Sequence, residues 1–463
     1  MKIRFVTLGC KLNFAESSAI GKALLEQGHT RAKQNEEADV CVINTCSVTD
    51  NADHKDRQAI HRIHRQNPNA IIIVTGCYAQ LQPEQIAQIE GVDYVLGQNE
   101  KYDIPALVER LESDAAKAAI GRSQGELLAI GERREARGDE TMRRKGEIHV
   151  CAIREVEEFH GVHSADDRTR CFLKVQDGCN YFCSYCTIPY ARGKSRNPLI
   201  SEVVKDAQEA LNNGAKELIL TGVNIGDFGR STGESFIDLI KALDDLGEEA
   251  RKREARGERR EGEEARDYRI RISSCEPNLL TDEIIDFVAN SKHFAPHFHI
   301  PLQSGSNEVL KIMGRRYTRE LFEERVKHIK QAMPHAFIGV DCMVGVRGET
   351  AEYFDDYVAF IKRLDVSQLH VFTYSERAHT RMLEMDLCVV PKSERQRRSK
   401  VLHEISETKT KTFYEQQQGR EAIVLWESKK EGDMMAGFTE NYVKVHRPYD
   451  KGKVNTFEEI IIG

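Results

Sequence analysis

Three features that would assign this chain to a broad class are missing from its 463 residues. No run of about 18 apolar residues occurs, so no segment is predicted to span a membrane. The opening residues, MKIRFVTLGC, have no charged region followed by a long apolar stretch, so they predict a first core strand instead of a secretory leader. The formal net charge is −7, which excludes a global basic surface for nucleic acid and confines any such site to a local patch.

Cysteine, by contrast, is abundant, with 12 residues in the chain. Without a predicted leader, this number favours a reducing compartment, the cytoplasm, where cysteine serves metal binding and chemistry. The length predicts about three domains.

One short loop holds three of the cysteines at C-x3-C-x2-C spacing: Cys179, Cys183 and Cys186, directly after the apolar run at 172–175. Three thiolates on a tight loop can each bind one iron of a cubic 4Fe–4S cluster, for which four protein cysteines are usual. The fourth iron would then be open to a ligand that is not protein.

The alternative for this loop is a structural zinc knuckle. Structural zinc normally takes four Cys or His ligands, so a fourth ligand would have to come from Cys171, His160 or His163. Three closely spaced cysteines without a paired fourth fit that ligand number poorly.

The first 112 residues alternate between strand-like and helical patterns. This rhythm predicts an open parallel α/β sheet with helices on its faces. The predicted strands lie at 3–8, 40–44, 71–75 and 94–96, and the predicted helices at 16–27, 52–65, 83–89 and 103–111.

Three of these strands are followed by a cysteine: Cys10, Cys46 and Cys77. Because ligands collect beyond the carboxyl ends of parallel strands, we expect these cysteines to converge and to hold a second 4Fe–4S cluster. Cysteines also pack in cores as small hydrophobic residues. Packing in the core suits Cys41, which lies inside a predicted strand. It does not explain why three other cysteines each follow the end of a predicted strand.

The strand–helix rhythm resumes at 171–374, with strands at 172–175, 217–221, 269–273, 298–301, 337–345 and 368–372. Six strands in one such series predict an open (βα)6 partial barrel, whose site lies at the carboxyl ends of the strands. Alternatively, the turns at these strand ends could be structural turns with no role in binding. The cofactor contacts that we predict at these strand ends are Gly222, Asn224, Ser274, Glu276, Gln303 and Ser304.

Composition sets the predicted domain boundaries. They are an N-terminal domain at 1–113, a charged linker at 114–165, the barrel at 166–400 with a charged insertion at 247–267, a connecting helix at 401–418 and a small all-β domain at 419–463.

Two groups of residues are candidates for binding RNA. Alternation at 442–447 predicts a half-exposed strand with Tyr442 and Lys444 on one face, and aromatic and basic side chains on a small β domain can stack bases and hold phosphate. On composition alone, however, this is a generic β module. Arg192, Lys194 and Arg196 have no acidic neighbour in sequence and could meet phosphate or a carboxylate, or form only a solvated loop.

A family resemblance follows from these motifs. DGCNYFCSYCTIPYARGKSR, at 177–196, resembles the methylthiotransferases of the radical S-adenosylmethionine superfamily, and NTC at 44–46 and VTGCYAQ at 74–80 resemble the N-terminal domain of the same family. The resemblance implies that S-adenosylmethionine binds the open iron of the first cluster beside Tyr185 and yields a 5′-deoxyadenosyl radical. It also implies that the second cluster carries the sulfur and that the C-terminal segment is a TRAM domain.

The resemblance further implies the substrate and partners. INTCSVT, VTGCYAQ and IPYARGKSR are most similar to the branch that acts on threonylcarbamoyladenosine at position 37, in the anticodon stem-loop of tRNA. An electron donor such as flavodoxin or ferredoxin, a monomeric state and no membrane partner are expected. The alternatives are the branches for isopentenyladenosine tRNA or a ribosomal protein, or a non-catalytic iron–sulfur protein that binds RNA or senses redox state.

The chain also departs from the family pattern. VGVRGET at 344–350 stands where a Phe-Pro pair is more common, His379 replaces the more usual Gly before Thr380, and Cys275 replaces an aliphatic residue.

Overall fold

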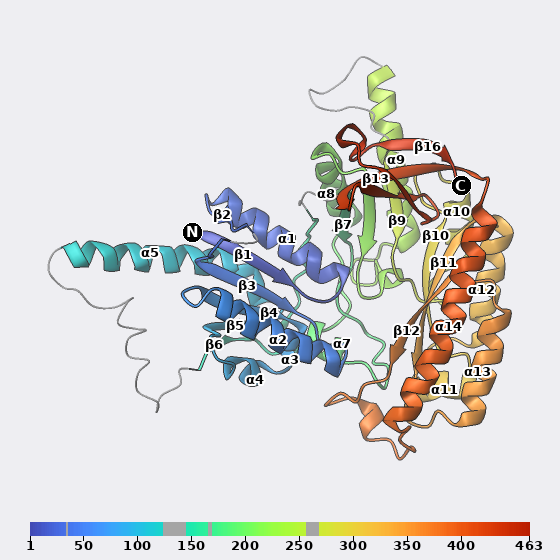
Figure 1. Cartoon of the computed structure of the whole chain (residues 1–463), viewed down its shortest axis with the longest axis horizontal. Coiled ribbons are helices and arrows are strands. Elements are labelled where there is room, and N and C mark those ends of the chain that lie inside the picture. Colours follow the sequence, from blue (N-terminus) through green and yellow to red (C-terminus); the bar gives the residue numbers. More distant parts are fainter. Residues whose placement is uncertain (34–35, 124–144, 165–168, 256–267) are drawn as a thin grey trace. The chain divides into compact units, whose positions relative to one another are not determined.

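The computed structural model describes residues 1–33, 36–123, 145–164, 169–255 and 268–463, and these form two compact units (Figure 1). The first unit is Met1–Glu158 together with Tyr190–Gly193, and the second is Phe159–Pro189 together with Lys194–Gly463. None of the described helices combines the length and apolar character that crossing a membrane requires.

The first unit is built on a six-stranded parallel sheet with the order β2-β1-β3-β4-β5-β6. Its central strand β3 is buried on both faces, which is why it reads as a continuous apolar run. The strands are β1 Lys2–Thr7, β2 Thr30–Arg31, β3 Val40–Thr45, β4 Ile71–Gly76, β5 Tyr94–Leu96 and β6 Glu147–His149. The helices are α1 Lys11–Glu26, α2 Asp50–Gln66, α3 Cys77–Leu81, α4 Pro83–Ala87 and α5 Ile104–Ser123.

The prediction of a linker at 114–165 was wrong in part. Strand β6 pairs with β5 and extends the first sheet, and the first unit continues to Glu158. The sequence of β6, EIH, contains a single apolar residue and so gives no strand pattern, whereas the equally short β5, YVL, is apolar throughout. Much of the charged part of the predicted linker, 124–144, lies outside the described residues.

The second unit contains the predicted partial barrel, in two parallel three-stranded halves. A parallel bridge between Ser274 and His299 joins the halves, and the Cys275 amide donates to the His299 carbonyl at 3.0 Å. The strands are β7 Arg170–Lys174, β8 Glu217–Thr221, β9 Arg269–Ile272, β10 His297–Gln303, β11 Phe337–Val344 and β12 Gln368–Thr373.

Helices cover the outer face of these strands, and the main core lies between the two layers. Threonine starts three of the helices by accepting a hydrogen bond from the first-turn backbone, namely Thr281, Thr318 and Thr350. The helices of this unit are α8 Ile200–Asn212, α9 Phe236–Ala255, α10 Asp282–Asn290, α11 Asn307–Met313, α12 Arg319–Ala332, α13 Ala351–Arg363 and α14 Lys392–Gln417. Helix α7, Ile188–Arg192, begins in this unit, and its residues from Tyr190 onward belong to the first unit. Of the predicted charged insertion, 256–267 lies outside the described residues.

The chain ends in a four-stranded antiparallel sheet with the order β15-β14-β13-β16, as predicted for an all-β segment. Helix α14 lies along β12 and leads into this sheet (Figure 1). It is one continuous helix across residue 400, where the predicted barrel ends and the predicted connecting helix begins. The strands are β13 Glu421–Glu431, β14 Met434–Thr439, β15 Lys444–Pro448 and β16 Phe457–Ile461.

A buried charge cluster joins the C-terminal sheet to the amino ends of the barrel strands. Glu217, at the start of β8, accepts hydrogen bonds from Arg269 and Arg271. The same arginines donate to the carbonyls of Ile423 and Glu440, at 3.3 and 3.1 Å. The C-terminal sheet therefore packs against the end of the barrel opposite the predicted site.

Candidate cluster and cofactor sites

The structure brings Cys10, Cys46 and Cys77 together at the carboxyl end of the first sheet. They follow β1, β3 and β4, which are neighbours in the sheet. Burial, followed by the nearby thiols of Cys77 and Cys10, raises the pKa of Cys46 to about 12. A Cβ atom at Gly9 would lie only 2.8 Å from the Cβ of Cys46, and the backbone there has a φ of +107°. A glycine is therefore needed for the turn at Cys10 to approach Cys46 so closely.

A buried charged network lies beside these three thiols. Glu16 accepts from Arg192 at 2.9 Å and from Lys101 at 2.8 Å, and all three side chains are at most 1% exposed. Arg192 also donates to the Asn13 amide oxygen at 2.7 Å, and that oxygen lies 3.4 Å from the sulfur of Cys10. The charges of Arg192 and Lys101 act on the Cys77 thiol and oppose the rise in its pKa that burial causes.

Arg192 was therefore wrongly predicted as a cation without an acidic partner. The partner is Glu16, which is 176 residues away in sequence and could not be found from local charge. Arg196 is also buried and pairs with Asp177 at 3.1 Å. Lys194 is exposed, so it remains a prediction for substrate or phosphate.

The second set of cysteines lies on the loop between β7 and α7. Burial, followed by the neighbouring Cys183 thiol, raises the pKa of Cys186 to about 12, and burial raises that of Cys179 to about 11. The loop is fixed from both sides through Ser184. The Ser184 amide donates to the Met313 carbonyl at 2.9 Å, and the Met382 amide donates to the Ser184 carbonyl at 2.7 Å.

Arg315 is a residue of this site that the sequence did not reveal. One of its terminal nitrogens donates to the sulfur of Cys183 at 3.2 Å and to the Tyr185 hydroxyl at 3.3 Å. The other pairs with Glu276, which we had predicted to contact the cofactor. Arg315 and Cys183 are 132 residues apart, so only the fold relates them.

Two of the predicted cofactor contacts have buried polar atoms without a well-formed hydrogen bond within the described residues. These atoms are the amide nitrogen and the amide oxygen of Asn224 and the amide oxygen of Gln303. Gln303 also has a φ of +64°, a strained value for a residue with a side chain. Unsatisfied buried polar atoms at the carboxyl ends of the barrel strands fit a polar ligand such as S-adenosylmethionine.

The other predicted contacts have different surroundings. A Cβ at Gly222 would lie 2.9 Å from the amide oxygen of Gln176, so this glycine makes room for a side chain of the protein. Ser304 is fully buried, and Ser274 forms the bridge to β10.

Gln176 is a second residue that the sequence did not reveal. It is fully buried, and its amide oxygen accepts from the backbone of Val223 and Asn224 at 2.9 and 2.8 Å. Its amide nitrogen donates to the carbonyls of Asp177 and Gly178, at 3.0 and 2.7 Å. It therefore holds the cysteine loop and the loop after β8 together.

Tyr442 was wrongly predicted to lie on a strand face open to RNA bases. Its φ of +69° places it in the turn before β15, and its ring stacks on Phe438 at 4.9 Å and contacts Arg271, also at 4.9 Å. Its ring thus packs the C-terminal sheet against the barrel. Lys444 lies on β15 and pairs with Glu431 at 2.8 Å on the surface.

Within the described ranges, no three His, Cys, Asp or Glu side chains are arranged to share one metal ion. In a 4Fe–4S cluster each thiolate binds a different iron, so the three sulfurs would not need to converge on one metal ion.

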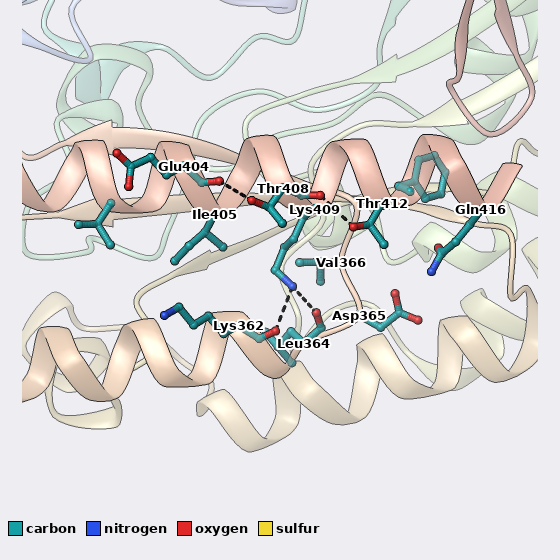
Figure 2. A pocket seen from close by; sticks show the side chains of 12 residues that line it. Lys362, Leu364, Asp365, Val366, Glu404, Ile405, Thr408, Lys409, Thr412 and Gln416 are labelled. Carbon is teal, nitrogen blue, oxygen red and sulfur yellow. Dashed lines mark hydrogen bonds between the residues drawn. The ribbon is translucent and has the colours of Figure 1, made fainter. Parts of the chain in front are cut away.

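A hollow of about 620 Å³ lies elsewhere, between the end of α13 and α14. Figure 2 shows Lys409 reaching across it to the carbonyls of Leu364 and Lys362, at 2.6 and 3.4 Å. None of the predicted site residues lines this hollow.

Both compact units of this chain resemble known proteins. Residues 2–97 match the uncharacterized protein family UPF0004, and residues 173–361 match the radical SAM superfamily. The threonylcarbamoyladenosine tRNA methylthiotransferase MtaB of Bacillus subtilis is 36% identical over 96% of this chain and 89% of its own length. The protein of the same name from Aquifex aeolicus is 34% identical over 96% and 97%. The tRNA-2-methylthio-N(6)-dimethylallyladenosine synthase of Alkaliphilus oremlandii is 29% identical over 88% and 78%.

Proposed function

Because this chain belongs to the methylthiotransferase family of radical S-adenosylmethionine enzymes, we propose that it converts N6-threonylcarbamoyladenosine at position 37 of tRNA to its 2-methylthio derivative. The chain is an enzyme that transfers a methylthio group, and its cofactors are S-adenosylmethionine and 4Fe–4S clusters. The observation that carries the finer proposal is the similarity, over nearly the whole chain, to two proteins named for this substrate.

In this proposal the six cysteines hold two clusters, one on Cys10, Cys46 and Cys77 and the other on Cys179, Cys183 and Cys186. When bound, the cluster on Cys179, Cys183 and Cys186 together with S-adenosylmethionine would supply a radical able to take a hydrogen atom from an unreactive C–H bond, and the cluster on Cys10, Cys46 and Cys77 would supply sulfur. The chain's own residues bind the cofactor and the substrate, orient them toward each other and exclude water. Asn224 and Gln303 offer unsatisfied polar atoms for S-adenosylmethionine, and the buried loop around Ser184 fixes the thiols.

We further propose that tRNA is the macromolecular partner and that Lys194 and Lys444 contact its phosphates. Both are lysines with at least part of the side chain open to solvent, and phosphate contacts supply most of the sequence-independent affinity for nucleic acid. A flavodoxin- or ferredoxin-type electron donor, a monomeric enzyme and a cytoplasmic location are part of the same proposal.

A direct test uses the reconstituted enzyme, S-adenosylmethionine and reductant with two tRNAs, one carrying threonylcarbamoyladenosine and the other isopentenyladenosine. We expect mass spectrometry of the nucleosides to detect the methylthio product only from the first tRNA. Product from the second tRNA alone would instead favour the substrate of the Alkaliphilus relative. Loss of the same nucleoside from cells that lack this protein would support the proposal independently.

A further inference from the structure

We propose that Arg315 is a positioning residue for the radical cluster, which stabilises the thiolate of Cys183 and raises the reduction potential of the cluster that this thiolate holds. The contact that carries this proposal is the hydrogen bond from the Arg315 guanidinium to the sulfur of Cys183, at 3.2 Å. The Arg315 side chain is only 4% exposed, so water screens this contact very little.

The rest of the Arg315 guanidinium is held in place by protein groups. Its Nε donates to the Tyr317 hydroxyl at 3.1 Å. That hydroxyl donates in turn to the carbonyls of Pro301 and Leu302, at 2.6 and 3.0 Å. Glu276 pairs with the remaining nitrogen. The guanidinium is therefore anchored to the end of β10 and to the loop after β9, with one N–H aimed at the sulfur.

This arrangement has a defined electrostatic consequence. Hydrogen bonds to cluster sulfurs and the net charge around a cluster are among the factors that set its reduction potential. Because reduction adds negative charge, a buried cation at a ligating sulfur stabilises the reduced state and raises the potential. The carboxylate of Glu276 offsets part of the Arg315 charge and so keeps the potential from rising further.

The next residue, Arg316, provides a matched comparison. It is exposed, it donates to the Asn180 carbonyl at 3.0 Å, and its guanidinium lies 4.1 Å from the centre of the Tyr181 ring. It therefore contacts the backbone and an aromatic ring of the same cysteine loop, and among the described residues it does not hydrogen-bond to a cysteine sulfur. A general weakening of the loop would affect both arginine variants, whereas an effect on the sulfur would affect only the Arg315 variant.

The test measures the midpoint potential of the radical cluster, by redox titration followed by electron paramagnetic resonance. Cys10, Cys46 and Cys77 are all replaced by Ala so that one cluster remains. In this background, R315M, R315K, E276Q and R316M are compared, with iron and sulfide counted for each. No tRNA is present, so the result does not depend on which nucleoside is the substrate.

We expect R315M to lower the midpoint potential, E276Q to raise it, and R316M to leave it unchanged. R315K keeps the charge but loses the planar geometry, so its potential should lie between those of R315M and the parent. Loss of iron from R315M but not from R316M would also support the proposal, because the thiolate would then need the arginine to hold its iron. A fully loaded R315M with the parent potential, or an E276Q without an upward shift, would overturn it.

Discussion

At the level of single residues, both cysteine sites pair a buried cation with a buried carboxylate. Arg192 and Lys101 share Glu16 beside the thiols of the first unit. In the second unit, Arg315 is balanced by Glu276 beside Cys183. Binding a cluster converts buried thiols with raised pKa values into thiolates, and a nearby buried cation lowers the electrostatic cost of that change.

Asn224 gives a residue-level prediction for S-adenosylmethionine. Among the described residues its buried amide makes no hydrogen bond of good geometry, with the Tyr181 hydroxyl as its polar neighbour, so a bound polar ligand would complete its hydrogen bonding. We expect Asn224→Ala to weaken the binding of S-adenosylmethionine about 5- to 10-fold, which corresponds to about 1 kcal/mol for one hydrogen bond. Equilibrium binding to the reconstituted enzyme measures this, with the exposed Asn290→Ala as the control. An unchanged affinity in Asn224→Ala would remove this residue from the cofactor site.

His379 gives a prediction about stability. Its φ of +65° is left-handed, which costs a residue with a side chain about 1–2 kcal/mol. Glycine avoids that cost but loses about 0.5–1 kcal/mol through its greater freedom in the unfolded chain. We therefore expect His379→Gly to raise the free energy of unfolding by up to about 1 kcal/mol in urea titrations. Ala378→Gly, one residue earlier and without a positive φ, should lower it instead; destabilisation by both variants would contradict this account.

At the level of elements, continuous apolar runs were enough to predict the strands that are buried on both faces. The predicted strand at 40–44 corresponds to β3, and that at 71–75 to β4. Strands β2 and β6 were not predicted, because TR contains no apolar residue and EIH contains only one.

Local alternation also misled the interpretation of Tyr442, because the turn conformation and the contact with Arg271 come from the tertiary structure. The cysteines were found because strand ends converge in a parallel sheet. Arg315 and Gln176 were not predicted, because the partners of their side chains are distant in sequence and no local sequence pattern identifies such a pair.

The attachment of the C-terminal sheet gives a prediction at this scale. Glu217 is fully buried, and although burial opposes ionisation, Arg269 and Arg271 lower its pKa to about 2. Replacing it by Gln leaves two buried arginines without their carboxylate. We expect Glu217→Gln to lower the free energy of unfolding by about 3–5 kcal/mol at pH 7.

The same substitution has a defined pH dependence. The folded-state pKa of about 2 lies below the ordinary value of 4.5, so the stabilisation by Glu217 is complete above pH 4.5 and is lost as the pH falls toward 2. The difference between the wild type and Glu217→Gln should therefore shrink on acidification in urea unfolding experiments. The exposed Glu283→Gln, which loses only a surface pair with Lys241, should change stability by less than about 1 kcal/mol. Equal effects of the two variants at pH 7 would rule out the charge cluster as a main attachment.

At the level of the whole molecule, the two sets of cysteines lie in separate compact units, each with its own hydrophobic core. Because each core is formed by residues of its own unit, we expect the substitution of cysteines in one unit to leave the other unit folded.

The most direct test of the two-cluster account measures 5′-deoxyadenosine and the methylthio nucleoside in the same reactions, for the wild type and three cysteine variants. Cys183→Ala should lose both products, because it removes a ligand of the radical cluster. Cys46→Ala should still release 5′-deoxyadenosine but form no methylthio nucleoside. Cys41→Ala, which changes a buried cysteine inside β3, should retain both products. Methylthio nucleoside formed by Cys46→Ala at the wild-type level would contradict the assignment of a sulfur-carrying cluster to Cys10, Cys46 and Cys77.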